Sequence, residues 1–189
     1  SVEIPDQSIY DYLFGSLDDG DLDRVALVDP ASGAETTYRA LRAQVDAFAG
    51  ALAARGVGTD TVVAMLCPNV PAFATVFHGI LRLGAPITTI NSLYTAHEIE
   101  NQLRDAEATW LVTVSPLLPP ALEAARAVGI PHDRIIVLDG AEGHPDLRAL
   151  LSEQRTPPEV TIDPATHVAV LPYSSGTTGV PKGVMLSHR

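Results

Sequence analysis

The sequence predicts an α/β fold in which mainly parallel sheets are flanked by helices. Short apolar runs alternate along the chain with longer segments whose apolar residues recur every three or four positions. Glycine or proline stands at most of the junctions between these segments. This alternation is typical of βαβ units, whose strands pair in parallel and whose helices cover the sheet.

The first helix is predicted from Thr37 to about Gly56. Its apolar positions Leu41, Val45, Phe48 and Leu52 recur at intervals of four, three and four residues. Gly56 stands where a helix would end with a C-cap. The later elements are expected in the order strand 61–66, helix 72–83, strand 85–90, helix 95–106, strand 110–114, helix 118–128 and strand 135–138. Thr95 and Glu98 have the spacing of a capping box at the start of the helix expected at 95–106.

A linker is predicted at residues 155–166, where prolines prevent a helix from continuing. The linker divides the chain into an N-terminal α/β subdomain, 1–154, and the start of a following segment, 167–189.

The following segment holds a polar loop between two apolar runs, 168–171 and 184–186, which are predicted to be short buried strands. Glycines at 176, 179 and 183 permit backbone N–H groups to approach an anion closely. Hydroxyl groups can donate further hydrogen bonds, and one lysine adds a positive charge. The candidate phosphate-binding residues are Ser174, Ser175, Gly176, Thr177, Thr178, Gly179 and Lys182.

Two familiar phosphate motifs do not fit this loop. A Walker-type loop would need a glycine at Pro181 and a hydroxyl at Gly183, and it would run into a helix. The pair Gly56 and Gly58, a candidate for dinucleotide binding, precedes a strand instead of opening a helix.

The segment 173–189 resembles the phosphate-binding signature of the adenylate-forming superfamily, which includes acyl-CoA synthetases, luciferases and peptide-synthetase adenylation domains. The pair Ser174 and Ser175, the ending 182–189 and the stretch 91–99 are similar to the branch of 4-coumarate and fatty acyl-CoA ligases. The resemblance implies the N-terminal part of the large domain of such a ligase.

The resemblance also implies a reaction in which ATP and a hydrophobic carboxylate, fatty or aryl-propenoic, form an acyl-adenylate before coenzyme A takes the acyl group. The candidate residues would then contact ATP, and Ser174 would touch Mg²⁺. Members of the superfamily continue for several hundred residues beyond the segment that resembles this chain. We therefore expect this chain to be an N-terminal fragment, and we expect the fragment alone to be inactive. Truncation would leave an apolar patch, so the fragment is expected to associate with itself or with the missing remainder.

Charge and composition argue against some classes of binding partner. A net charge of −11 argues against nucleic acid or an anionic membrane, and the sequence lacks a signal peptide and a long apolar run, which favours the cytoplasm. The acidic cluster 18–23 is predicted to be a solvated turn, and Cys67 a buried structural residue. The histidines lack metal-ligand spacing, although His188 lies close enough to the loop to orient it.

Three alternatives remain open at this stage. They are an amino-acid adenylation domain of a peptide synthetase, a short binding module without catalytic activity, and an unrelated phosphate-binding NTPase.

Overall fold

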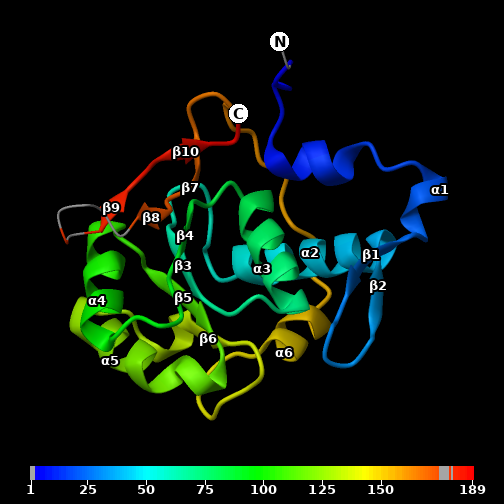
Figure 1. Ribbon diagram of the computed structural model, residues 1–189. Coiled ribbons are helices and arrows are strands. Elements are labelled where there is room, and N and C mark those ends of the chain that lie inside the picture. The colour runs from blue at the N-terminus through cyan, green and yellow to red at the C-terminus, as the bar shows by residue number, and fades with distance from the viewer. Residues whose placement is uncertain (1–2, 175–178, 180) are drawn as a thin grey trace.

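A six-stranded sheet forms the centre of the computed structural model, which describes residues 3–174, 179 and 181–189 (Figure 1). The strand order is β10-β7-β4-β3-β5-β6. The strands are β3 (Val63–Leu66), β4 (Ile87–Thr89), β5 (Trp110–Thr113), β6 (Ile135–Val137), β7 (Val168–Val170) and β10 (Leu186–Ser187). Only β10 is antiparallel to its neighbour, so the predicted mainly parallel sheet is confirmed among the described residues.

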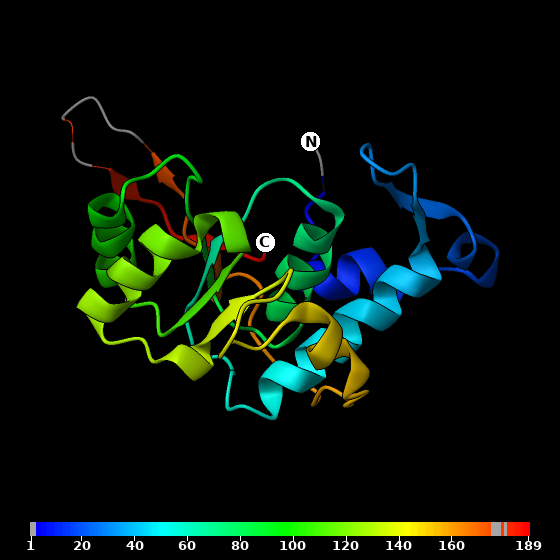
Figure 2. The ribbon, with the colours of Figure 1, turned by 90° about the horizontal axis from the view of Figure 1, so that it is seen from below.

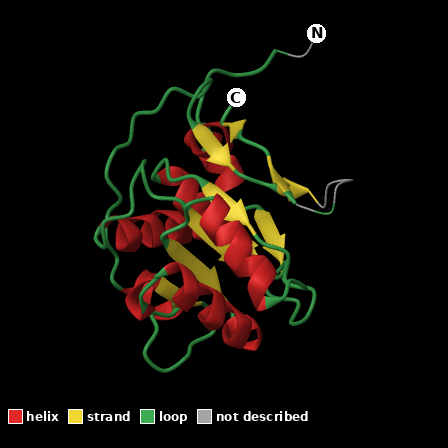
Figure 3. Ribbon diagram, turned by 90° about the vertical axis from the view of Figure 1, so that its left-hand side faces the viewer, coloured by secondary structure: helices red, strands yellow, loops and turns green. Residues whose placement is uncertain are grey.

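Helices cover both faces of this sheet, as Figures 2 and 3 show. One face is covered by α2 (Tyr38–Ala53), α3 (Pro71–Arg82) and α6 (Leu147–Ser152). The other is covered by α4 (Ala96–Asp105) and α5 (Leu118–Val128). Short 3-10 helices η2 (Ser115–Leu117) and η3 (His132–Arg134) precede α5 and β6. Every helix and strand expected between residues 37 and 138 is present, with ends displaced by a few residues.

The two cores on either side of the sheet share its central strands. In β3, Val63 and Met65 belong to the core beneath α2 and α3, whereas Ala64 and Leu66 belong to the core beneath α4 and α5. Successive side chains of a strand point to opposite faces, so a strand covered on both sides is apolar throughout.

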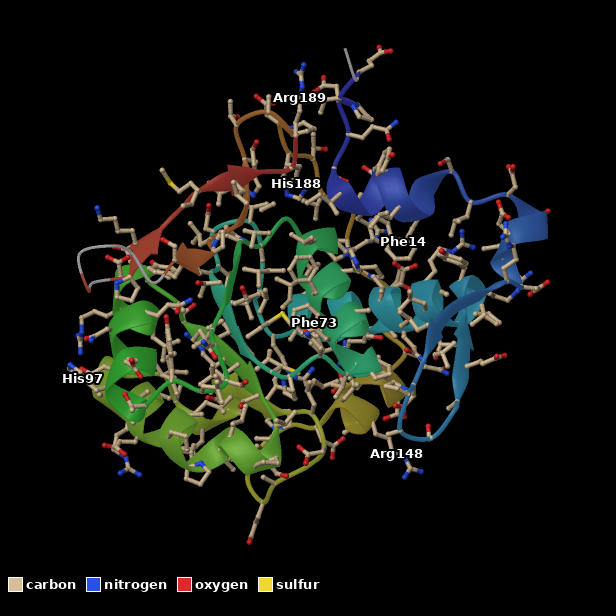
Figure 4. All side chains as sticks on the ribbon, viewed as in Figure 1. Phe14, Phe73, His97, Arg148, His188 and Arg189 are labelled. Atoms are coloured by element: carbon tan, nitrogen blue, oxygen red, sulfur yellow. The ribbon has the colours of Figure 1, made fainter. Side chains whose placement is uncertain are left out.

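The N-terminal region carries elements that the sequence did not predict. They are η1 (Asp11–Gly15), α1 (Asp19–Leu22), and the antiparallel pair β1 (Val25–Val28) and β2 (Glu35–Thr37). Phe14 packs with Tyr10, Leu41 and Val45 in a third core, and Figure 4 shows it beside the helical layer. The acidic cluster 18–23 is solvated at Asp18, Asp19 and Asp23, as expected, but it forms the single helical turn α1, which buries Leu22.

Local predictions at helix ends and in the linker can be compared directly. The capping box of Thr95 and Glu98 is present, and Gly56 adopts a positive φ of 91° just beyond α2. Residues 154–163 contain no helix or strand. They pack against α2 so closely that a Cβ on Gly50 would lie 2.0 Å from the carbonyl oxygen of Arg155.

Candidate phosphate-binding site

The two strands that flank the candidate loop form an antiparallel pair beside the edge of the central sheet (Figure 1). Strand β8 (Tyr173–Ser174) pairs antiparallel with β9 (Lys182–Gly183), and both lie between β7 and β10 in the sequence. The base of the hairpin is tied to the sheet, because the Leu171 amide donates to the carbonyl of Ile87 at 2.7 Å. The sheet therefore fixes where the loop begins and ends.

Three of the predicted phosphate-binding residues lie within the described part of the chain. Ser174 and Lys182 are direct cross-strand partners in the hairpin, and both are exposed. Gly179 is exposed and has a positive φ of 79°, the left-handed conformation that favours glycine. The other predicted residues, Ser175, Gly176, Thr177 and Thr178, lie outside the described residues. The pairing of the two strands thus places Ser174 directly opposite Lys182 on an exposed hairpin.

The apolar run that follows the loop departs from its prediction. Val184, Met185 and Leu186 were expected to form a buried strand, but their exposed fractions are 48, 75 and 48%. Strand β10 begins only at Leu186, and it lies at the edge of the sheet. The prediction of a buried strand at 184–186 is therefore wrong, because β10 is an edge strand that pairs only with β7 among the described residues.

A cavity of about 580 Å³ lies between the hairpin and α4. It is lined by Tyr94, Glu98, Asn101, Gln102, Asp105, Tyr173, Gly179 and Pro181. A volume of this size is typical of small-molecule sites. The cavity lies beside α4, whose residues were not among the predicted phosphate contacts.

The carboxylates beside this cavity are held by hydrogen bonds. The Tyr173 hydroxyl donates to Oδ2 of Asp105 at 2.6 Å, and the Thr95 amide donates to Oε2 of Glu98 at 2.7 Å. The Thr95 bonds lower the pKa of Glu98, while burial and the neighbouring Asp105 raise the pKa of Tyr173. Sequence reasoning missed Tyr173 and Asp105, because 68 residues separate them.

His188 lies against the N-terminal segment, and Figure 4 shows it close to that end of the chain. Its Nδ1 accepts a hydrogen bond from the Ile9 amide at 3.2 Å, and its ring lies 6.0 Å from that of His167. Burial, followed by the neighbouring His167, lowers the pKa of His188 to about 4. These contacts make His188 a link between β10 and the N-terminus.

The described part of the chain has no cluster of metal-ligating side chains, and its cysteine is buried. No group of three or more His, Cys, Asp and Glu residues there is arranged to hold a metal ion. Cys67 is buried, as predicted, and burial raises its pKa to about 11. Of the helices in residues 3–174, 179 and 181–189, none combines the length and apolar character needed to cross a bilayer.

The sequence pattern of the AMP-binding enzyme family matches residues 18–189, a span that includes the hairpin and the whole six-stranded sheet. The chain belongs to this family. The resemblance to adenylate-forming enzymes and the predicted fold class are therefore confirmed.

Members of the family with known identity are similar over most of the chain. A 4-coumarate–CoA ligase of Oryza sativa subsp. japonica is 40% identical over 167 residues, which cover 88% of this chain and 29% of that protein. Another rice 4-coumarate–CoA ligase is 39% identical over 191 residues, which cover 100% of this chain and 34% of the relative.

A solved structure gives the same result. The anthranilate CoA ligase AuaEII, in complex with anthranoyl-AMP, superimposes with a TM-score of 0.87 at 29% identity, over 98% of this chain and 36% of that one. The chain therefore spans about a third of the length of its relatives.

Proposed function

We propose that this chain forms the N-terminal part of an ATP-dependent acyl-CoA synthetase and that its hairpin binds the phosphates of ATP. The observation that carries the proposal is the pairing of Ser174 with Lys182 on an exposed hairpin, in a chain of the AMP-binding enzyme family. An ammonium group and a hydroxyl carried by paired residues suit a phosphate group, which accepts several hydrogen bonds at once.

The role of the hairpin in this proposal is electrostatic. When a carboxylate attacks the α-phosphorus of ATP, negative charge accumulates on the departing pyrophosphate, and Lys182 stabilises that charge. The hydroxyl of Ser174 orients a phosphate oxygen beside it. The remaining predicted contacts, Ser175, Gly176, Thr177, Thr178 and Gly179, are proposed to surround the same phosphates.

Mg²⁺ fits this site only as a companion of the nucleotide. Its usual ligands are substrate phosphates, water and one or two carboxylates, and the Ser174 hydroxyl is the one predicted protein ligand here. Bound Mg²⁺ would neutralise part of the phosphate charge. Lys182 would hold phosphate oxygens, and the Ser174 hydroxyl would help to hold the ion.

The proposed substrate is a hydrophobic carboxylate, aryl-propenoic or fatty, and the proposed acyl acceptor is coenzyme A. The support is the 39–40% identity to two 4-coumarate–CoA ligases. The full-length protein that carries this chain should form thioesters from aromatic or fatty acids with ATP and coenzyme A. A panel of aromatic, fatty and amino acids, assayed by pyrophosphate exchange and thioester formation, tests this.

Each alternative has its own result in that panel. Activation of amino acids only, with transfer to a carrier protein, would identify a peptide-synthetase adenylation domain. ATP hydrolysis without any carboxylate would identify an unrelated NTPase. Binding of ATP without exchange or hydrolysis would leave a binding module. Any of these results would overturn the synthetase proposal.

By itself, the 189-residue chain is proposed to be inactive and to bind ATP weakly. In this proposal, residues 1–154 form one subdomain, 155–166 a linker, and 167–189 the start of the next segment.

The exposed Val184, Met185 and Leu186 would promote association of the chain with a second copy or with the remainder of the enzyme. Titration calorimetry with Mg·ATP and light scattering test both parts, and micromolar binding by a monomer would contradict them. The proposed location is the cytoplasm.

A further inference from the structure

Helix α4 contacts β8, the first strand of the hairpin, and Figures 1 and 2 both show the two side by side. The Tyr173 hydroxyl, on β8, donates to Oδ2 of Asp105 at 2.6 Å. Asp105 is the last residue of α4, where the helix dipole disfavours a negative charge by about 0.3–1 kcal/mol. Helix stability therefore gives no reason for a carboxylate at this position, whereas the contact with Tyr173 does.

A second, buried contact joins the same helix to the base of the hairpin. Gln102, one turn before Asp105, donates from Nε2 to Oγ1 of Thr88 at 2.9 Å. The Thr88 hydroxyl in turn donates to the carbonyl oxygen of Leu171 at 2.8 Å. Both Gln102 and Thr88 are buried, with exposed fractions of 4 and 0%. A buried hydrogen-bonded chain of this kind has one favourable arrangement, which fixes the backbone two residues before Tyr173.

The ring of Tyr173 also determines which residue stands opposite it. Gly183 is the cross-strand partner of Tyr173, and a Cβ on Gly183 would lie 2.8 Å from Cζ of that ring. Glycine therefore allows the ring to lie across β9 and reach Asp105. Lys182 is the neighbour of Gly183 and the partner of Ser174, so the ring and its hydrogen bond act next to the proposed phosphate contacts.

We infer that Tyr173 and Asp105 are positioning residues that brace the phosphate-binding hairpin against α4. The inference rests on the proposed function, because it assigns these residues an effect on the placement of Ser174 and Lys182. Neither side chain needs to touch the nucleotide. Loss of the brace should change the rate of the step that uses the hairpin and leave recognition of the carboxylate unchanged.

The test uses the full-length protein with the variants Tyr173→Phe, Asp105→Ala, the double variant and Asp105→Asn. Tyr173→Phe keeps the ring on Gly183 and removes only the hydroxyl. Each of the first two variants should lower kcat of ATP–pyrophosphate exchange by about 5- to 50-fold, with KM for the carboxylate unchanged. The double variant should be no slower than the slower single variant, because both lose the same bond. Asp105→Asn, whose amide oxygen still accepts a hydrogen bond, should retain most of the activity.

Tyr12→Phe is the matched control, because Tyr12 is exposed on η1 and its hydroxyl has no hydrogen bond among the described residues. Wild-type rates in Tyr173→Phe, or losses that multiply in the double variant, would overturn the inference.

Hydrogen exchange of the peptide amides of β8 and β9 measures the brace without catalysis. Exchange should be faster, and to a similar extent, in Tyr173→Phe and Asp105→Ala, and unchanged in Tyr12→Phe. If wild-type protein lacks pyrophosphate exchange, the proposed function fails while this measurement still decides the brace. Equal exchange in all proteins would overturn the brace even where the enzyme is active.

Discussion

Two pairs of β-strands in this chain differ in what surrounds them. All residues of β3 and β5 are buried between two layers of helices, whereas β8 and β9 contain exposed or half-buried residues and carry the candidate site. The first pair is apolar except for Thr113 and belongs to the mainly parallel sheet; the second contains a tyrosine, a serine, a lysine and a glycine. We therefore expect substitutions in the central sheet and its helices to reduce stability. Substitutions in the hairpin should reduce activity and have little effect on folding.

The largest expected effect comes from the buried side of this comparison. Phe48 is fully buried on α2, and a Cβ on Gly79 of α3 would lie 2.7 Å from its ring. Phe48→Ala would leave a cavity between two closely packed helices, so the free energy of unfolding should fall by about 3–5 kcal/mol. Urea denaturation of the 189-residue chain measures it. A loss below about 1 kcal/mol would mean that this interface does not stabilise the fold.

An intermediate effect is expected at the link between β10 and the N-terminus. The pKa of His188 is about 4 in the folded chain and near 6.5 when exposed, so the unfolded chain binds more protons between these values. Stability should therefore fall as the pH decreases from about 6.5 to 4. We expect a loss of about 1–2 kcal/mol, because the half-buried ring remains partly in contact with water.

The measurement is urea denaturation at pH 7, 5.5 and 4 for wild type and His188→Gln. The difference between the two proteins should change with pH, since glutamine does not titrate. Two neighbours also influence the pKa of His188: His167, whose ring lies 6.0 Å away, lowers it, and Asp11 raises it. His167→Gln serves as a second comparison, because it removes the neighbouring imidazole. Parallel pH curves for wild type and His188→Gln would contradict the buried neutral imidazole.

The smallest effect is expected next to the hairpin. Met185 has an exposed fraction of 75%, so Met185→Ser should alter the free energy of unfolding by less than about 0.5 kcal/mol. Equilibrium denaturation, compared with Phe48→Ala under the same conditions, measures the contrast. A loss as large as that of Phe48→Ala would remove the distinction between the two regions.

The order of the main helices and strands from Thr37 to Leu138 could be predicted because its signals are local. The apolar residues that indicate α2 are three or four positions apart, and the two residues of the α4 capping box are three positions apart. The N-terminal hairpin of β1 and β2 was missed, because its strands are short and half exposed and lack a clear alternation.

The candidate site could be predicted only in part. The residues of the loop form a continuous segment, and Ser174, Gly179 and Lys182 are exposed, while their contact with phosphate stays a prediction. The contacts of Tyr173 with Asp105, and of Thr88 with Leu171, join segments that are distant in sequence. Without tertiary structure, neither residue pair has a distinguishing pattern, so the support beneath the loop could not be foreseen.

The central claim is that the hairpin acts on the phosphates of ATP and contributes little to stability. The most direct measurement is ATP–pyrophosphate exchange at saturating carboxylate by the full-length protein carrying Lys182→Ala, alongside thermal unfolding. Arg148→Ala is the matched control, because it removes an exposed positive charge from α6, far from the hairpin in Figure 4. We predict that Lys182→Ala slows exchange by about 10- to 1000-fold, equivalent to roughly 1.5–4 kcal/mol, with an unchanged unfolding temperature, while Arg148→Ala behaves as wild type. Near wild-type exchange by Lys182→Ala would contradict the claim.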